Sequence, residues 1–190
     1  MDRIVVVVPQ GMRRLSEDVI CPQDYPKVAA LVEGGTRRMD SVFQGLQQLS
    51  DRCDRVVVHD AVRPLLSPRL LRQVIQASTE YPAVIPGIPA KETVKELSSS
   101  HMVRATLDRS RIWLVQTPQI FQPELLLRAH QQAQDQGWNA PDDAYLAEKM
   151  GCSVRVVPGS ECNVKITTAF DLRLAELLLR QNLVILGSPD

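Results

Sequence analysis

Short apolar runs alternate along this chain with segments whose apolar residues recur at helical spacing. Runs of this length, rich in β-branched residues, are typical of strands that are buried on both faces of a sheet. They predict strands over residues 3–8, 28–32, 55–58, 83–85 and 153–157. Because strands and helices alternate, we expect an α/β fold with a mostly parallel sheet and helices on both of its faces.

Capping residues mark where several helices should begin. Thr36 is expected to cap a helix whose apolar positions are Met39, Val42, Phe43, Leu46 and Leu49. A hydroxyl followed by proline starts a second helix at Ser67, and its buried face is expected to contain Leu70, Leu71, Val74 and Ile75. Further helices are predicted from Pro123, over 142–150 and over 169–180, where Thr168 and Asp171 form a capping box.

One segment interrupts this alternation. Residues 93–97 and 102–107 are strand-like and are joined by three serines and a histidine, which predicts a β-hairpin inserted into a single domain that spans residues 1–190. An isolated hairpin is marginally stable in water. We therefore expect the arm, residues 88–107, to pack on something else, such as a second subunit.

The composition excludes several classes of protein. The net charge is zero, so no general electrostatic attraction to nucleic acid or to a membrane is expected. The four cysteines form no C-x-x-C pair and there are three histidines, so there is no zinc pattern, and reduced thiols in the cytoplasm are expected. The longest apolar run, residues 4–8, is too short to span a bilayer, and no signal-peptide cleavage site follows it.

An acidic residue at a strand end gives the strongest sign of a site. The strand over 55–58 leads into His59, Asp60 and Ala61, with Arg63 shortly after. Ligands of open α/β sheets bind at the carboxyl ends of strands, and Asp60 is suited to hold a divalent cation on phosphate oxygens. A solvated pair between Asp60 and Arg63 is the alternative, while His59 is interpreted as a packing residue.

A glycine pair follows another predicted strand. Gly34 and Gly35 precede a helix, where they would let a ligand approach the backbone near a helix N-terminus. An ordinary tight turn is the alternative. The pair fits neither G-x-G-x-x-G nor a Walker A loop, which argues against a dehydrogenase and against a P-loop enzyme. Taken singly, Arg109 and Lys165 are compatible with solvated surface charges. Thr117, with Pro118 and Gln119, is compatible with a plain turn.

Five motifs in this order resemble those of the methylerythritol phosphate cytidylyltransferases. They are G-G-x-x-R-x-x-S-V-x-x-G-L over 34–46, H-D-A-x-R-P over 59–64, T-P-Q-x-F over 117–121, D-D-A over 142–144, and N-V-K-I-T over 163–167 with the D-L and A-E pairs that follow. The resemblance implies a Rossmann-like nucleotide-binding fold, a homodimer joined by the arm and a Mg²⁺-dependent reaction. In that reaction of non-mevalonate isoprenoid synthesis, the phosphate of 2-C-methyl-D-erythritol 4-phosphate attacks the α-phosphorus of CTP and pyrophosphate leaves.

The resemblance also implies roles for particular residues. Carried over by position, the nucleotide-binding residues are Gly35 and Ser41, which should contact cytosine, with Asp60 (also the metal ligand) and Ala61 close by. Arg109 and Lys165 are the expected catalytic residues, because they would hold the attacking phosphate in line. The substrate pocket is expected to include Thr93 and Thr117 besides these two. Thr93 and Arg109 would reach the neighbouring subunit through the arm, and Arg63 would support the Asp60 loop.

Three departures from the family pattern bear on activity. The family's opening strand and glycine-rich loop, whose cations stabilise the triphosphate, have no counterpart here, so we expect that the sequence lacks this N-terminal unit. Pro141 replaces a threonine of the substrate pocket, and Cys162 replaces an acid. The alternatives are therefore a cytidylyltransferase for another polyol phosphate, such as ribitol 5-phosphate, or an inactive homodimeric binding protein.

Overall fold

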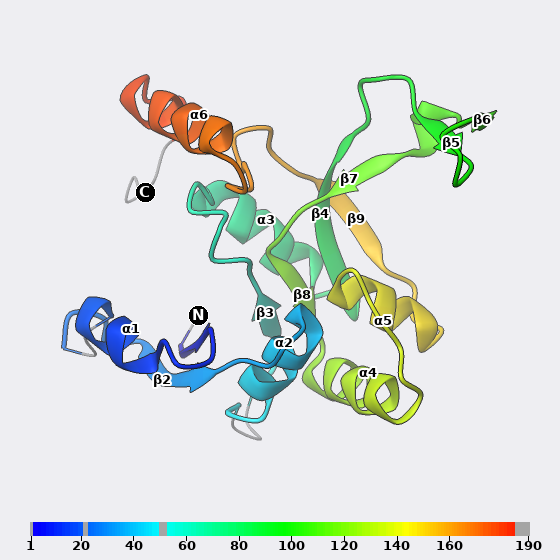
Figure 1. Cartoon of the computed structure of the whole chain (residues 1–190). Helices are drawn as coiled ribbons and strands as arrows, with labels where there is room; N and C mark the ends of the chain where they lie inside the picture. The colour runs from blue at the N-terminus through cyan, green and yellow to red at the C-terminus, as the bar shows by residue number, and fades with distance from the viewer. Residues whose placement is uncertain (1, 21–22, 50–52, 185–190) are drawn as a thin grey trace. The chain divides into compact units, whose positions relative to one another are not determined.

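A computed structural model describes residues 2–20, 23–49 and 53–184 and divides the chain into two compact units (Figure 1). Each unit combines two separate segments of the chain: the first joins Met1–Val56 with Phe121–Cys152, and the second joins Val57–Ile120 with Ser153–Asp190. The α/β fold predicted from the sequence is confirmed. A single domain over residues 1–190 stays a prediction.

The first unit contains a two-stranded parallel sheet and four helices. The strands are β1 (Ile4–Val8) and β2 (Val28–Glu33), close to their predicted bounds. The helices are α1 (Arg13–Val19), α2 (Arg38–Leu46), α4 (Pro123–Asp135) and α5 (Asp143–Lys149). Helices α4 and α5 lie side by side, and a buried cluster joins them to α2 through Met39, Ala129, Ala133 and Leu146.

The start of α2 differs by one residue from the prediction. Arg37, not Thr36, occupies the N-cap position, and its N–H donates to Asp40 Oδ2 at 3.1 Å. The Arg37 guanidinium lowers the pKa of Asp40 because it donates hydrogen bonds to that carboxylate, 2.7 Å from Nη2 to Oδ1. Thr36 also contacts the carboxylate from outside the helix. A negatively charged residue in the first turn interacts favourably with the partial positive charge of the helix N-terminus.

The second unit is built on a five-stranded mixed sheet. Its strands are β3 (Val56–Val58), β4 (Ala83–Pro89), β7 (Trp113–Val115), β8 (Gln119–Phe121) and β9 (Arg155–Pro158). The strand order is β3-β8-β4-β7, and β9 pairs with β4. The expected parallel arrangement holds between β4 and β9, but β7 runs antiparallel to β4. The antiparallel strand follows from the hairpin, which returns the chain beside β4.

Helix α3 (Pro68–Ala77) covers the core of this sheet. Ser67 caps it as predicted, accepting a hydrogen bond from the Leu70 N–H at 3.2 Å. Leu70 and Val74 pack with Val84, Ile120 and Val157 in a buried cluster. Ile75 was predicted to belong to the buried face but is 38% exposed, because it lies one position beyond the side that meets the sheet.

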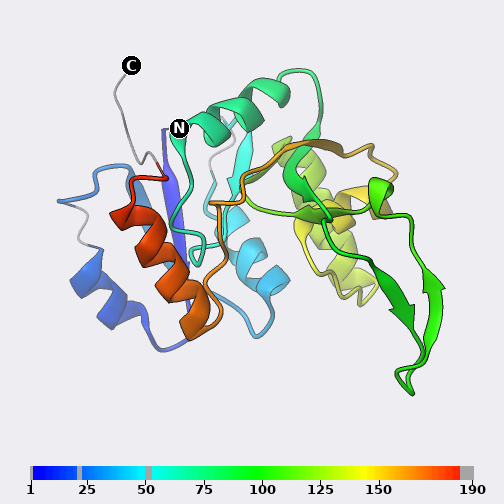
Figure 2. The ribbon, with the colours of Figure 1, turned by 90° about the horizontal axis from the view of Figure 1, so that it is seen from above.

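The predicted hairpin is present. Strands β5 (Lys95–Leu97) and β6 (Val103–Thr106) pair antiparallel and project from the ends of β4 and β7, as both views show (Figures 1 and 2). A short 3₁₀ helix, η1 (Arg109–Arg111), leads from β6 into β7. Several apolar side chains of the arm are exposed within the unit: Leu97, Met102, Val103 and Leu107.

Helix α6 (Ala169–Arg180) begins with the predicted capping box. The Thr168 hydroxyl accepts from the Asp171 N–H at 3.2 Å, and the Asp171 carboxylate accepts from the N–H of Thr168 at 2.8 Å. These hydrogen bonds and those from Thr167 lower the pKa of Asp171 to about 2. In the described part of the chain, no helix is both long and apolar enough to cross a membrane.

Removing this cap should destabilise the chain measurably. Thr168→Ala deletes the acceptor of one N-terminal N–H, and we expect the free energy of unfolding to fall by about 1 kcal/mol. Urea unfolding would measure the change. Thr79→Ala is the matched control, since the Thr79 hydroxyl donates to the carbonyl of Gln76 and caps no helix N-terminus. Equal stability of the two variants would contradict the prediction.

Candidate active site

The glycine pair of the first unit forms a tightly packed junction between β2 and α2. The Gly35 N–H donates to Ser41 Oγ at 3.2 Å, so the two residues predicted to bind the nucleotide base contact each other. A side chain on Gly34 would collide with Ser41, and one on Gly35 would collide with Asp40. The glycines are therefore needed for close packing of the loop on the first turn of α2.

Three predicted site residues of the second unit gather at the carboxyl end of β3. Lys165 Nζ lies 3.1 Å from Asp60 Oδ2. The Asp60 N–H donates to Thr117 Oγ1 at 3.0 Å. Asp60 is largely buried, with 14% of its side chain exposed, whereas 44% of the Lys165 side chain is exposed. The lysine side chain is thus the more accessible member of the pair, and the aspartate the more buried one.

Thr117 is fixed by the turn that carries it. The residue is buried and precedes a cis peptide bond to Pro118. Its hydroxyl lies 3.1 Å from His59 Nδ1, and His59 Nε2 lies 3.1 Å from the carbonyl oxygen of Arg63. Because a carbonyl only accepts, Nε2 carries the proton and Nδ1 accepts from the Thr117 hydroxyl. Burial lowers the pKa of His59, which favours this neutral tautomer.

Arg63 supports the loops as the sequence analysis expected. The Asp60 carboxylate pairs with Lys165, and its charge also acts to raise the pKa of Arg63 against the larger effect of burial, so the solvated Asp60–Arg63 pair stays an alternative. Arg63 Nη1 donates to the main-chain oxygen of Asn163 at 2.7 Å, and the Ile166 N–H donates to the oxygen of Val62 at 2.8 Å. These two bonds join the loop after β3 to the loop that bears Lys165. Burial lowers the pKa of Arg63.

The remaining predicted residues lie elsewhere in the second unit. Arg109 begins η1, and its Nη1 donates to the carbonyl oxygen of Lys91 at 2.5 Å, at the base of the arm. Lys91 itself pairs with Glu161. Thr93 and Ala61 are both exposed, Thr93 between β4 and β5 and Ala61 directly after Asp60. Asp60, Lys165 and Thr117 are thus joined by direct contacts, whereas Arg109 lies at the base of the arm.

Sequence reasoning missed two buried amides next to this cluster. Asn163 is 1% exposed and its Nδ2 donates to the carbonyl oxygen of Thr117 at 2.8 Å. The Gln116 side chain donates to the carbonyl oxygen of Ser160 at 2.8 Å and accepts from the Ser160 N–H at 3.1 Å. Gln116 directly precedes Thr117, and Asn163 lies two residues before Lys165. This closeness in sequence to predicted site residues was the signal that could have identified them.

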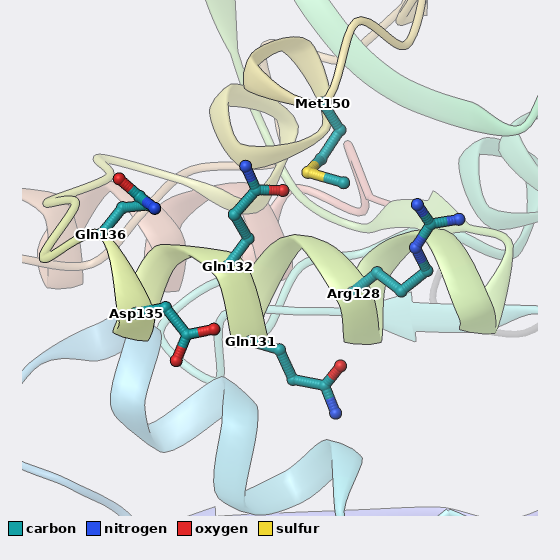
Figure 3. A pocket seen from close by; sticks show the side chains of 6 residues that line it. All are labelled: Arg128, Gln131, Gln132, Asp135, Gln136 and Met150. Carbon is teal, nitrogen blue, oxygen red and sulfur yellow. The ribbon is translucent and has the colours of Figure 1, made fainter.

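Two further features of the described residues bear on ligand binding. Within the described ranges no group of three or more His, Cys, Asp or Glu side chains could hold a metal ion. Mg²⁺ nevertheless needs only one or two protein carboxylates when substrate phosphates supply further ligands, and Asp60 fits that role. A shallow hollow over α4 is lined by none of the predicted residues (Figure 3). Its side chains are Arg128, Gln131, Gln132, Asp135, Gln136 and Met150.

The described cysteines form no disulfide. They are Cys53, Cys152 and Cys162, and Cys21 lies outside the described residues. Burial raises the pKa of Cys152, which opposes thiolate formation. The reduced state expected from the sequence stays a prediction.

The fold and these strand-end residues define a nucleotide-binding α/β transferase. The family model IspD, 2-C-methyl-D-erythritol 4-phosphate cytidylyltransferase, matches residues 1–181. The chain therefore belongs to this family of cytidylyltransferases, which transfer the cytidylyl group of CTP to 2-C-methyl-D-erythritol 4-phosphate in the non-mevalonate isoprenoid pathway. Enzymes of the family use a divalent metal ion.

Curated relatives and solved structures agree with this assignment. The chain is 46% identical to the 2-C-methyl-D-erythritol 4-phosphate cytidylyltransferase of Symbiobacterium thermophilum over 82% of this chain and 66% of the relative. It is 41% identical to that of Syntrophus aciditrophicus over 95% and 78%. A crystal structure of 4-diphosphocytidyl-2C-methyl-D-erythritol synthase from Anaerococcus prevotii matches with a TM-score of 0.85 at 31% identity, over 95% and 79%. The chain thus spans about two thirds to four fifths of these proteins.

Proposed function

We propose that this chain transfers the cytidylyl group of CTP to 2-C-methyl-D-erythritol 4-phosphate, with Lys165 and Arg109 holding the attacking phosphate. The observation that carries the proposal is the Asp60–Lys165 pair beside the buried Thr117, at the carboxyl end of β3. Ligands of open α/β sheets bind at this edge. The Lys165 side chain, 44% exposed, carries a positive charge suited to receive a phosphate.

The reaction requires positioning rather than a covalent enzyme intermediate. An oxygen of the acceptor's phosphate forms a bond to the α-phosphorus of CTP, the bond to the β-phosphate oxygen breaks, and pyrophosphate leaves with that electron pair. Lys165 would neutralise part of the phosphate's charge, while Asp60 keeps the ammonium group directed into the site. Thr117 would contact the polyol phosphate, and Gly35 and Ser41 would bind cytosine. Held in line, the reactants gain the rate advantage of proximity.

Mg²⁺ is the metal we propose for this site, with Asp60 as its protein ligand. The oxygen donor of a carboxylate suits a hard cation, and phosphate oxygens and water would complete the ligand set. When bound, the ion would supply charge neutralisation on the phosphates. Because Lys165 lies 3.1 Å from the same carboxylate, the two cations would share Asp60.

The arm supports a homodimer. Its exposed apolar residues, Leu97, Met102, Val103 and Leu107, would be covered by a second copy of the chain. Arg109 and Thr93 lie at the base of the arm, from which they would contribute to the partner's site. In this arrangement Lys165 would act in its own chain's site and Arg109 in the partner's.

Pyrophosphate release tests the proposed function. The full chain is incubated with CTP, Mg²⁺ and 2-C-methyl-D-erythritol 4-phosphate, and release is expected to depend on all three. Arg109→Ala should lower kcat/KM by about 10²-fold, because one charged contact to the reacting phosphate is lost. Arg104→Ala is the matched control on the same arm, since that arginine is exposed and lies 3.9 Å from Glu96.

Two results would overturn the proposal. Absence of release by the wild-type chain would exclude the activity for this chain. Faster release with ribitol 5-phosphate would correct the acceptor while leaving the nucleotide unchanged.

A further inference from the structure

Asn163 joins three loops of the second unit at one buried point. Its Nδ2 donates to the carbonyl oxygen of Thr117 at 2.8 Å and approaches Gln116 Oε1 at 3.4 Å. Its own carbonyl oxygen accepts from Arg63 Nη1 at 2.7 Å, and its N–H donates to the oxygen of Ser160 at 3.1 Å. The loops after β3, before β8 and after β9 therefore meet at this residue.

The orientation of the Asn163 amide follows from its neighbours. Both groups near Nδ2 are oxygen acceptors, so exchanging Oδ1 and Nδ2 would bring like dipoles together. In this orientation Oδ1 is buried and has no hydrogen-bond partner in the described part of the chain. A buried acceptor left unpaired is destabilising, because it loses its hydrogen bond to water and gains none in the folded chain. Stability alone therefore gives little reason for an amide here.

The same amide is well placed to fix the two residues that face the substrate. Lys165 is two residues further along the loop, and the Ile166 N–H that follows is bound to Val62. Thr117 is held at its carbonyl by Asn163 and at its hydroxyl by the Asp60 N–H and His59. A shift of Asn163 would move Lys165 and Thr117 relative to each other.

We infer that Asn163 is a positioning residue of the transfer reaction: its side-chain amide sets the distance between Lys165 and Thr117, and so holds the polyol phosphate in line. The inference rests on the proposed function for the identity of the substrate. It predicts that changing the amide lowers kcat/KM for the acceptor substrate. The binding of CTP should be unaffected, because cytosine is assigned to Gly35 and Ser41.

Asn163→Leu is the informative variant. Leucine has a similar volume and removes both the unpaired Oδ1 and the donor to Thr117, so the two effects on stability oppose each other. We expect the melting temperature to stay close to that of the wild type. The kcat/KM for 2-C-methyl-D-erythritol 4-phosphate should fall at least about 10-fold, because small misplacements of reacting groups are costly. The KM for CTP should change less than about threefold, since the variant retains the residues assigned to CTP binding.

A matched control separates stability from positioning. Ser78→Ala removes a buried hydroxyl that donates to the Ile75 carbonyl at the end of α3, a local bond outside the site. It should lower the melting temperature slightly and leave both kinetic constants unchanged. Unchanged acceptor kcat/KM in Asn163→Leu, with an active wild type, would overturn the inference.

A structural measurement keeps the inference testable if the wild-type chain does not turn over. A crystal structure of Asn163→Leu should show the Lys165 Nζ to Asp60 Oδ2 distance, 3.1 Å here, lengthened or broken. An inactive wild type would contradict the proposed function without touching this expectation. A pair that persists at its present distance in the variant would overturn the positioning role.

Discussion

Replacing Lys165 with methionine is expected to lower kcat/KM by about 10²- to 10³-fold, the loss typical of removing one preorganised charge from a developing anion. Methionine keeps most of the side chain's length and apolar contacts and deletes only the ammonium group. The pair with Asp60 is partly exposed, and exposed ion pairs contribute at most about 1 kcal/mol to stability. The variant should therefore fold normally and fail in the transfer step.

Steady-state kinetics with both substrates would measure this loss. Lys91→Met is the matched control, because Lys91 belongs to the same unit, is more exposed and pairs with Glu161 instead of Asp60. It should retain activity within about threefold, as surface charges outside a site usually do. Full activity of Lys165→Met would remove Lys165 from the mechanism and leave Arg109 as the remaining phosphate ligand among the predicted catalytic residues.

The fold was predicted most accurately where a local signal stood alone in the sequence. Ser67 with Pro68 and Thr168 with Asp171 each marked a helix start that the structure confirms. In both cases a side chain next to the helix supplies the missing acceptor, so no distant residue decides the outcome. Thr36 was one residue off because Asp40 accepts from the Arg37 N–H as well as from the Thr36 hydroxyl.

Elements that depend on distant pairing were missed. Strands β7 and β8 have three residues each and no clear alternation of apolar and polar positions. Residues 113–115 are exposed, whereas 119–121 are buried, so the two strands share no pattern. They are strands because β4 and its neighbours supply their hydrogen-bond partners. Helix α1, seven residues long with none of them buried, likewise gave no apolar periodicity.

The candidate site shows the same difference between residues with a local sequence signal and residues that only tertiary contacts identify. Asp60 was proposed because a strand end and an acid are adjacent in sequence, and Lys165 because of the family resemblance; the structure shows that the two side chains pair. Asn163 and Gln116 could not be assigned roles, since a buried amide cannot be told from an exposed one by residue type alone. Only the tertiary contacts with Thr117 and Ser160 distinguish them.

The first unit contains a buried charge cluster centred on Asp143 of the D-D-A motif, for which the sequence predicted no contacts. Asp143 is fully buried and accepts from Arg38 Nη1 at 2.7 Å and from His130 Nε2 at 2.8 Å. The His130 ring also stacks on Phe43, with centroids 6.1 Å apart. These contacts tie α5 to α2 and α4. Burial alone would raise the pKa of Asp143, but the hydrogen bond with His130 and the charge of Arg38 outweigh it, and the pKa is lowered.

Asp143→Asn is expected to lower the free energy of unfolding by about 3 kcal/mol at neutral pH. Removing one member of a buried ion pair typically costs 3–5 kcal/mol, and Arg38, 31% exposed, regains some hydration, which favours the lower end. Urea unfolding would measure the difference. Asp135→Asn on α4 is the control, because Asp135 is exposed and should change stability by less than about 0.5 kcal/mol.

The pH dependence of this loss identifies its cause. Because the folded-state pKa of Asp143 is lowered, its stabilising effect is complete above the unfolded-state pKa of about 3.9 and disappears as the pH falls through the folded value. The wild type should therefore lose its advantage over Asp143→Asn as the pH falls below about 4, a range in which the neutral variant has no charge at this position to lose. A stability difference that stays constant from pH 7 to pH 3 would show that asparagine disturbs packing, and that the charge of Asp143 is not what joins α5 to α2 and α4.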